Sequence, residues 1–368
     1  MLNDHDELDK LAISWSDKKC LAIDTEFERR TTYFAKLALV QVYDGEAIYL
    51  IDPLTMDCPK SFREVLENPQ ITKILHSSKE DLEVLYTSWN CKVKGVFDTQ
   101  VAFSFLYDEL SIGYAKLVEE MTGTFVSKGE TNSDWIKRPL SERQLNYAAK
   151  DVLYLIDIFR QLESKLSNKG YFRFFHAECE EYCEGAYLKM EAQADYRDAK
   201  DVNLLDGNDL GLFKILFDWR EQRAKTDDRT RNHIIRDQAL VQLVKMKASS
   251  TNQLKMIADL HPRSVRLYAD EWFDIISQWQ SSEKINLPMI PNPRDVKEFN
   301  RFSTALESIV KSIAKANQIS ATLLLSKRLI KKLAFSILTD GQLPVQWQGW
   351  RKELLEELVA DKVAEFKL

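Results

Sequence analysis

Two acidic residues, Asp24 and Glu26, stand two positions apart within a short apolar segment at residues 21–27. Alternate side chains of a strand share a face, so this spacing places both carboxylates together; Tyr147 and Asp151, four residues apart, likewise share one face of a helix. Clustered carboxylates repel one another unless a cation compensates, and hard divalent cations such as Mg²⁺ take carboxylate oxygens as ligands. These residues therefore predict a metal site.

A third acid, Asp81, follows the predicted strand Ile71–Leu75 and lies near the start of the next helical pattern. Ligands of α/β proteins collect at such strand ends, so Asp81 is a candidate for the same site. His76 stands between the two elements. We expect it to be structural, because an imidazole at a strand end commonly satisfies nearby backbone groups.

The first half of the chain alternates short apolar segments with helical patterns. Strands are predicted over five segments: Leu21–Phe27, Leu37–Val42, Ala47–Ile51, Ile71–Leu75 and Val93–Phe97. The first three, with a turn at Asp44-Gly45, indicate an antiparallel meander. The last two lead into helices at Lys79–Trp89 and Thr99–Tyr107, the order expected of parallel strands. We therefore expect an α/β domain with a mixed sheet flanked by helices.

Ser141 and Gln144 have the spacing of a capping box, which marks a helix start. Apolar residues at helical spacing then predict one long helix ending near Leu166. Tyr147 and Asp151 would both lie on this helix.

From about residue 205 the patterns are helical only. The segment Asp206–Asp209 indicates a helix start, and prolines at 288, 291 and 293 indicate a second boundary. We expect three domains, at residues 1–205, 206–285 and 290–368.

A weak repeat of ninety residues links the two helical domains. The first copy contains Ala224, Ile234-Ile235 and Ala239-Leu240, and the second contains Ala314, Leu324-Leu325 and Leu329-Ile330. We interpret this as a duplication; the alternative is chance similarity between helical segments.

The composition restricts the partners and the cellular compartment that are expected for this chain. The formal net charge of −6 argues against a uniformly basic nucleic-acid coat, although residues 311–332 hold six basic residues and no acidic one. Five cysteines without a CxxC pair favour a reducing compartment. The acidic start is unlike a signal peptide, and no apolar run reaches the roughly 18 residues of a membrane span. We expect a soluble, cytoplasmic protein.

The acids and Tyr147 together resemble the active site of the DEDD exonuclease superfamily. A histidine subgroup has its histidine five residues before the last aspartate, but here that position is Asn146. Tyr147 lies four residues before Asp151, as in the tyrosine subgroup. The flanking words resemble ribonuclease D: Asp24-Thr25-Glu26-Phe27, Leu39-Val40-Gln41, His76-Ser77-Ser78-Lys79-Glu80-Asp81, Ser133-Asp134-Trp135-Ile136-Lys137-Arg138-Pro139-Leu140 and Tyr147-Ala148-Ala149-Lys150-Asp151-Val152.

The resemblance spans residues 15–165 and implies a ribonuclease H-like (DnaQ-like) exonuclease domain. The downstream helices resemble two HRDC-type domains, the first near Trp219-Arg220-Glu221 and the second diverged. By resemblance, Asp24, Glu26, Asp81 and Asp151 bind two divalent cations, Mg²⁺ or Mn²⁺. Tyr147 is the fifth catalytic residue and would orient the attacking water.

The implied function is a 3′→5′ exoribonuclease that trims tRNA precursors and other small stable RNAs to nucleoside 5′-monophosphates. A 3′→5′ DNA exonuclease and a non-catalytic RNA-binding adaptor are the alternatives. No Walker-type Gly-x-x-x-x-Gly-Lys motif occurs, so no nucleoside triphosphate is expected. We also expect no membrane partner and a monomer.

Three further features have two interpretations each. Trp135 either contacts substrate or fills an apolar face, and Arg138 either contacts substrate or pairs with an acid. His176, Cys179 and Cys183 offer soft ligands on one helix but lack the fourth ligand and the knuckle of a zinc site. We do not expect zinc there.

Overall fold

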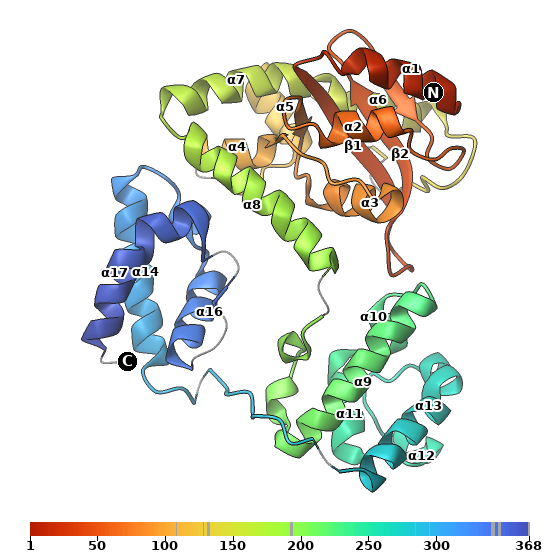
Figure 1. Cartoon of the computed structure of the whole chain (residues 1–368), viewed down its shortest axis with the longest axis vertical. Helices are drawn as coiled ribbons and strands as arrows, with labels where there is room; N and C mark the ends of the chain where they lie inside the picture. The colour runs from red at the N-terminus through yellow and green to blue at the C-terminus, as the bar shows by residue number, and fades with distance from the viewer. Residues whose placement is uncertain are drawn as a thin grey trace. The chain divides into compact units, whose positions relative to one another are not determined.

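A computed structural model describes the chain except residues 108, 128, 131–132, 192–193, 284, 294, 340–342, 345–346 and 367–368, and the side chain of residue 189. The chain forms two compact units. Unit 1 comprises residues 1–28, 36–191 and 297–368, and unit 2 comprises residues 29–35 and 192–296 (Figure 1). Within the described residues, no helix is long and apolar enough to cross a membrane.

Unit 1 contains one five-stranded sheet. Its strands are β1 (Cys20–Glu28), β2 (Lys36–Tyr43), β3 (Ile48–Ile51), β4 (Thr72–Leu75) and β5 (Val96–Asp98). Their order is β3-β2-β1-β4-β5. Strands β1, β2 and β3 are antiparallel neighbours, whereas β4 is parallel to β1 and β5 is parallel to β4. The predicted mixed sheet is confirmed.

The pairing of β1 with β2 fixes the position of the two strand acids. Asp24 lies opposite Gln41 and Glu26 lies opposite Leu39. Immediately afterwards the register shifts, because Phe27 pairs with Leu37 and Ala38 is the extra residue. Such a bulge bends a strand and increases its twist. The bend therefore comes directly after the second acid.

Helices cover both sides of the sheet. Helices α1 (His5–Trp15), α2 (Lys60–Glu67) and α3 (Lys79–Trp89) belong to the first part of the chain. Trp15 is completely buried, and its ring packs edge-on against Tyr49 of β3 and Phe62 of α2. Aromatic rings of this size bury a large apolar area, which anchors α1 and α2 to the sheet.

The predicted helix from Ser141 to Leu166 is two helices. The capping box at Ser141 and Gln144 is present, but α6 (Glu142–Leu153) ends at Tyr154 and α7 (Leu155–Asn168) follows. Helix α6 contacts β1, β2 and β3, whereas α7 contacts β1, β4 and α4 (Thr99–Leu106). The break redirects the chain across the sheet, and neither proline nor glycine marks it in the sequence.

Two more helices of unit 1 are α5 (Tyr114–Thr122) and α8 (Phe172–Glu191). Helix α8 binds the last helix of the chain, α17 (Gly349–Glu365), through the carboxylate of Glu178. Trp350 Nε1 donates to this carboxylate at 3.0 Å, and the buried Arg351 guanidinium donates to both of its oxygens. Such two-pronged contacts between arginine and carboxylate are geometrically specific.

Unit 2 is helical. Its elements are the short 3-10 helices η1 (Tyr196–Asp198) and η2 (Val202–Leu204) and the α-helices α9 (Gly207–Thr226), α10 (Arg231–Ile234), α11 (Asp237–Met246), α12 (Thr251–Leu254) and α13 (Pro262–Ser281). The Asp206 side chain caps α9, at the helix start predicted from the sequence. Trp272 and Tyr268 of α13 are buried and pack against Trp219 of α9.

The segment at residues 29–35 belongs to unit 2 although it joins β1 to β2. Tyr33 joins this segment to the helices of unit 2. Its backbone N–H donates to Asp228 at 3.0 Å, and its hydroxyl lies between Glu221 and Arg231 at 3.4 and 3.3 Å. The Arg231 guanidinium also lies over the Tyr33 ring.

The ninety-residue repeat has a structural counterpart in α14 (Phe299–Ala316), α15 (Ala321–Leu324) and α16 (Lys327–Leu338). The one-turn helices α10 and α15 start at residues 231 and 321, and α11 and α16 start at 237 and 327. Asp228 and Gln318 both have positive φ, 47° and 55°. An equivalent backbone hydrogen bond follows the helix that precedes each pair, α9 and α14. The N–H of Arg229 donates to the carbonyl oxygen of Ala224, and the N–H of Ile319 donates to that of Ala314. This geometry favours duplication over chance similarity.

Candidate metal centre

Three of the four predicted acids come together. Asp24 and Glu26 extend from β1, and Asp151 lies on α6, the helix that covers β1 to β3. Each of the three offers a carboxylate oxygen, and these oxygens lie within 4.8 Å of one another. The alternation of side chains along β1 and the packing of α6 against this strand thus produce the carboxylate cluster that the spacing predicts.

The electrostatics of the cluster show why it suits a cation. Burial raises the pKa of Asp24 well above its ordinary value, and the neighbouring Asp151 raises it further. Burial, followed by Asp24, raises the pKa of Glu26 to about 10. Burial raises the pKa of Asp151 to about 7. The protein alone therefore disfavours the three ionised forms, which a divalent cation with a preference for carboxylate oxygen would stabilise.

Tyr147 lies one helical turn before Asp151 on α6. Its hydroxyl donates a hydrogen bond to the Asp151 carboxylate, and this bond opposes the rise in the pKa of that carboxyl. The Tyr147 ring packs at 6.1 Å from the ring of Trp135. The phenol is therefore held at the carboxylate cluster by contacts at both of its ends.

Asp81 lies outside the group of three, in the first turn of α3. Its Oδ1 accepts a 2.5 Å hydrogen bond from the hydroxyl of Thr25, the residue between the two strand acids. Burial raises the pKa of Asp81 well above its ordinary value, and Asp24 raises it further. Asp81 therefore interacts electrostatically with the cluster but is held by a different partner.

The turn that delivers Asp81 is organised by Asp98, which the sequence analysis did not identify. This buried carboxylate accepts from the backbone N–H groups of Ser77 and Ser78 at 3.1 and 2.8 Å, and from the Ser78 hydroxyl at 2.8 Å. It also caps the start of α4 by accepting from Gln100 and Val101. Its place just before the predicted helix at Thr99 is an N-cap signal that could have revealed it.

His76 is structural, as expected. Its Nδ1 lies 2.9 Å from the Thr99 hydroxyl and its Nε2 lies 3.0 Å from the carbonyl oxygen of Ile112. Burial lowers the pKa of the imidazole. Both ring nitrogens are occupied in joining β4 to neighbouring segments.

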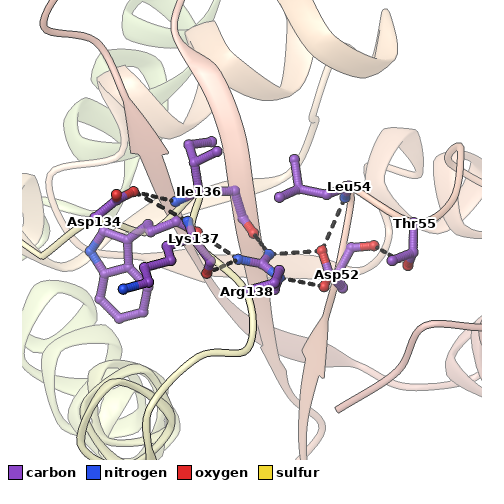
Figure 2. Close-up of polar contacts among 9 residues, drawn as sticks. Asp52, Leu54, Thr55, Asp134, Ile136, Lys137 and Arg138 are labelled. Carbon is purple, nitrogen blue, oxygen red and sulfur yellow. Dashed lines mark hydrogen bonds and ion pairs between the residues drawn. The ribbon is translucent and has the colours of Figure 1, made fainter.

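The structure decides between the two interpretations of Arg138. Its guanidinium makes a two-pronged ion pair with the buried Asp52, at 2.6 and 2.7 Å, and also donates to the carbonyl oxygens of Trp135 and Ala38 (Figure 2). The pairing interpretation is therefore correct. Arg138 clamps the segment at residues 133–140 onto the ends of β2 and β3.

Trp135 fills an apolar face, the second of its two interpretations. It is buried in a cluster with Ala38, Leu39, Leu140 and Ala148. This cluster includes Ala148 of α6 and therefore anchors the helix that carries Tyr147 and Asp151.

Tyr114 at the start of α5 is a neighbour of the cluster that sequence reasoning missed. Its hydroxyl donates to the Lys150 carbonyl at 2.6 Å, next to Asp151. Burial raises the pKa of this phenol, and Asp151 and Asp24 raise it further. A single tyrosine after a glycine carries no recognisable signal, so only the fold reveals this proximity.

The three soft ligands of α8 differ in their exposure. His176 is more than half exposed and pairs with Glu180, whereas Cys179 and Cys183 are buried.

Comparison with known proteins identifies similarity along almost the whole chain. The family described as 3'-5' exonuclease matches residues 1–167, and the HRDC domain matches residues 209–276. Ribonuclease D of Cronobacter turicensis is 32% identical over 97% of this chain and 98% of its own length. Ribonuclease D of Escherichia coli K12 is 30% identical over 100% of this chain and 98% of its own length.

The similarity extends to three-dimensional structure. The crystal structure of Escherichia coli RNase D, described as an exoribonuclease involved in structured RNA processing, superimposes with a TM-score of 0.92. The superposition covers 100% of this chain and 98% of the other at 29% sequence identity.

Proposed function

Because the chain belongs to the ribonuclease D family and is therefore a 3′→5′ exoribonuclease, we propose that it trims the 3′ ends of tRNA precursors and other small stable RNAs. The observation that carries this proposal is the cluster of Asp24, Glu26 and Asp151, with the Tyr147 hydroxyl bonded to one of its members. The products would be nucleoside 5′-monophosphates.

The cluster would hold two divalent cations, Mg²⁺ or Mn²⁺. Asp24 would contribute to both positions, Glu26 and Asp151 would complete one of them, and Asp81 would support the other through water. When bound, the two cations would stabilise charge on the attacking and leaving oxygens of the phosphodiester. The four carboxylates suit the binding of such cations, because carboxylate oxygens are the ligands that Mg²⁺ and Mn²⁺ prefer.

Tyr147 would orient the attacking water. Its unperturbed pKa near 10 makes a phenol a poor base at neutral pH. A hydroxyl fixed between Asp151 and the apolar cluster around Trp135 can hold a water molecule in one place instead. The catalytic set would then be Asp24, Glu26, Asp81, Tyr147 and Asp151.

The helical parts would supply affinity for RNA. Lys327, Arg328, Lys331 and Lys332 are exposed on α16. Glu307 of α14 is a carboxylate beside these basic side chains: it pairs with Lys311, and Lys311, Lys327 and Lys331 lower the pKa of its carboxyl. Basic side chains bind RNA phosphates and release counterions.

We further propose a division into an exonuclease domain at residues 1–205 and two HRDC-type domains at residues 206–285 and 290–368, within a monomer. The matching start positions of α10 and α15, and of α11 and α16, support the two related modules.

The proposal is tested with 5′-end-labelled tRNA precursors and matched DNA, incubated with Mg²⁺, Mn²⁺ or EDTA. The expected result is stepwise shortening of RNA from its 3′ end, with 5′-monophosphates as products and no reaction in EDTA. A 3′-phosphate should block the reaction, because a dianion would be repelled by the carboxylate cluster. Rapid digestion of circular RNA would contradict the exonuclease mechanism. Preference for DNA would contradict the proposal that RNA is the substrate.

A further inference from the structure

Gln41 of β2 lies directly opposite Asp24 of β1 in the antiparallel pair. Directly opposed residues of such a pair have their side chains on the same face, with Cβ atoms about 5 Å apart. The amide of Gln41 therefore belongs to the face that carries Asp24 and Glu26. On its other side, Gln41 pairs with Leu50 of β3, which packs in the apolar cluster of Trp135 and Tyr147.

This amide is completely buried and unsatisfied. The side chain has 0% of its surface exposed, and neither Nε2 nor Oε1 has a hydrogen-bond partner among the described residues. A buried polar group without a partner costs about 1–3 kcal/mol. Because Leu39, two residues earlier on the strand, and Leu50, paired with Gln41 from β3, are apolar, an apolar side chain of similar length would avoid this cost. The amide therefore contributes something other than the stability of the isolated chain.

We propose that Gln41 is a positioning residue of the cation centre, an inference that rests on the proposed function. Its amide would donate to the Asp24 carboxylate, or to water that accompanies a bound cation, and its carbonyl oxygen would accept from that water. Asp24 is the carboxylate assigned to both cation positions, so the orientation of its oxygens sets the geometry of the centre. Partners of metal ligands act in this way, and their loss typically weakens metal affinity about 10- to 100-fold.

The inference predicts an unusual pair of effects for Gln41→Met, which keeps the length of the side chain and removes both polar atoms. Without metal, this variant should be as stable as the wild type or more stable, because the unsatisfied groups are gone. Its affinity for Mn²⁺ should nevertheless fall about tenfold. A purely structural glutamine would produce the opposite pair, with lost stability and unchanged affinity.

The experiment measures Mn²⁺ binding by calorimetry on the full chain without RNA, together with urea unfolding in EDTA. Leu50→Met is the matched control, because it alters packing next to Gln41 but leaves the amide intact. Its Mn²⁺ affinity should equal that of the wild type.

Wild-type Mn²⁺ affinity in Gln41→Met would overturn the inference. Lost metal-free stability in Gln41→Met with unchanged affinity would assign the amide to the fold instead. Failure of the proposed metal centre would look different, because the wild-type protein would then bind no Mn²⁺.

Discussion

The hydroxyl of Thr25 donates a 2.5 Å hydrogen bond to the carboxylate of Asp81. Thr25 stands between Asp24 and Glu26, and its side chain alternates with theirs along β1. One strand therefore presents two acids directly and positions a third acid, from α3, through the intervening residue. In the motif Asp-Thr-Glu, the two acids thus belong to the carboxylate cluster and the threonine holds Asp81.

Replacing Thr25 by Val should separate this positioning role from the ligands themselves. The change preserves shape but leaves a buried carboxylate without its donor, which costs about 1–3 kcal/mol of unfolding free energy. Turnover of RNA should also fall, because Asp81 loses its fixed orientation. Thr25→Ser keeps a hydroxyl and serves as the control in urea unfolding and nuclease assays. Equal activity of Thr25→Val and the wild type would show that Asp81 needs no such support.

Asp24→Asn and Asp151→Asn should each nearly abolish hydrolysis while the metal-free fold becomes more stable. The substitution removes a ligand charge at constant volume and relieves repulsion among the clustered acids. Circular dichroism, urea unfolding in EDTA and RNA turnover test this expectation. Asp157→Asn, at an exposed carboxylate of α7, is the matched control and should change neither property. More than a tenth of wild-type turnover in either cluster variant would contradict the assignment.

Tyr147→Phe should lower turnover about tenfold to a thousandfold, as expected for the loss of one positioning group in the transition state. RNA affinity, measured in Ca²⁺ to suppress cleavage, should change little. The variant also loses the hydrogen bond that lowers the pKa of Asp151, so its activity should rise at higher pH than that of the wild type. Tyr43→Phe, at a partly exposed tyrosine of β2, is the control. A parallel loss of affinity and turnover would place Tyr147 in substrate recognition instead.

The metal-free protein should become less stable as pH rises from about 5 to 8. The pKa of Asp151 is about 7 and that of Glu26 is about 10 in the folded protein, whereas unfolded carboxyls titrate near pH 4. The folded state therefore binds more protons in this range. The extra stability of the folded state is complete at pH values below the pKa of the carboxyls in the unfolded chain. It is lost as the pH rises through the pKa values of these carboxyls in the folded protein.

Urea unfolding in EDTA at several pH values measures this slope, and Asp24→Asn should make it shallower by removing one of the repelling charges. Added Mn²⁺ should stabilise the protein most at high pH, since it binds the ionised cluster. Metal-free stability that stays constant or increases with pH in this window would contradict the proposed electrostatics of the site.

Charge reversal of Lys327, Arg328, Lys331 and Lys332 to Glu should weaken binding of tRNA precursors and reduce the dependence of affinity on salt. Every phosphate that the variant no longer neutralises keeps its counterions, so fewer counterions are released on binding. Cleavage of short oligonucleotides should persist, because the carboxylate cluster is unchanged. Lys60→Glu and Lys352→Glu, at exposed lysines elsewhere, are the controls. Salt slopes equal to that of the wild type would assign α16 to another role.

Local signals in the sequence were sufficient for much of the fold. Helix α3 has the predicted bounds, Lys79–Trp89, because an apolar period and a strand end define it. The break at Tyr154 had no such signal, since it depends on tertiary contacts: α6 extends over β2 and β3, whereas α7 extends over β4. The partners of Arg138 and Asp98 could not be predicted from the sequence either. Arg138 contacts Asp52, and Asp98 contacts Ser77 and Ser78, so each contact joins residues far apart in the sequence.

The segment at residues 29–35 limits how this protein can be dissected. The chain enters unit 2 once between β1 and β2 and again after α8, so no single cut releases the helical unit intact. A protein ending near residue 205 would keep Tyr33 but lose Glu221, Asp228 and Arg231, the residues that Tyr33 contacts. The connection that follows β1 would then lack its anchor. The nuclease and the first helical module are therefore interleaved parts, and exchange of modules between relatives would have to include this loop.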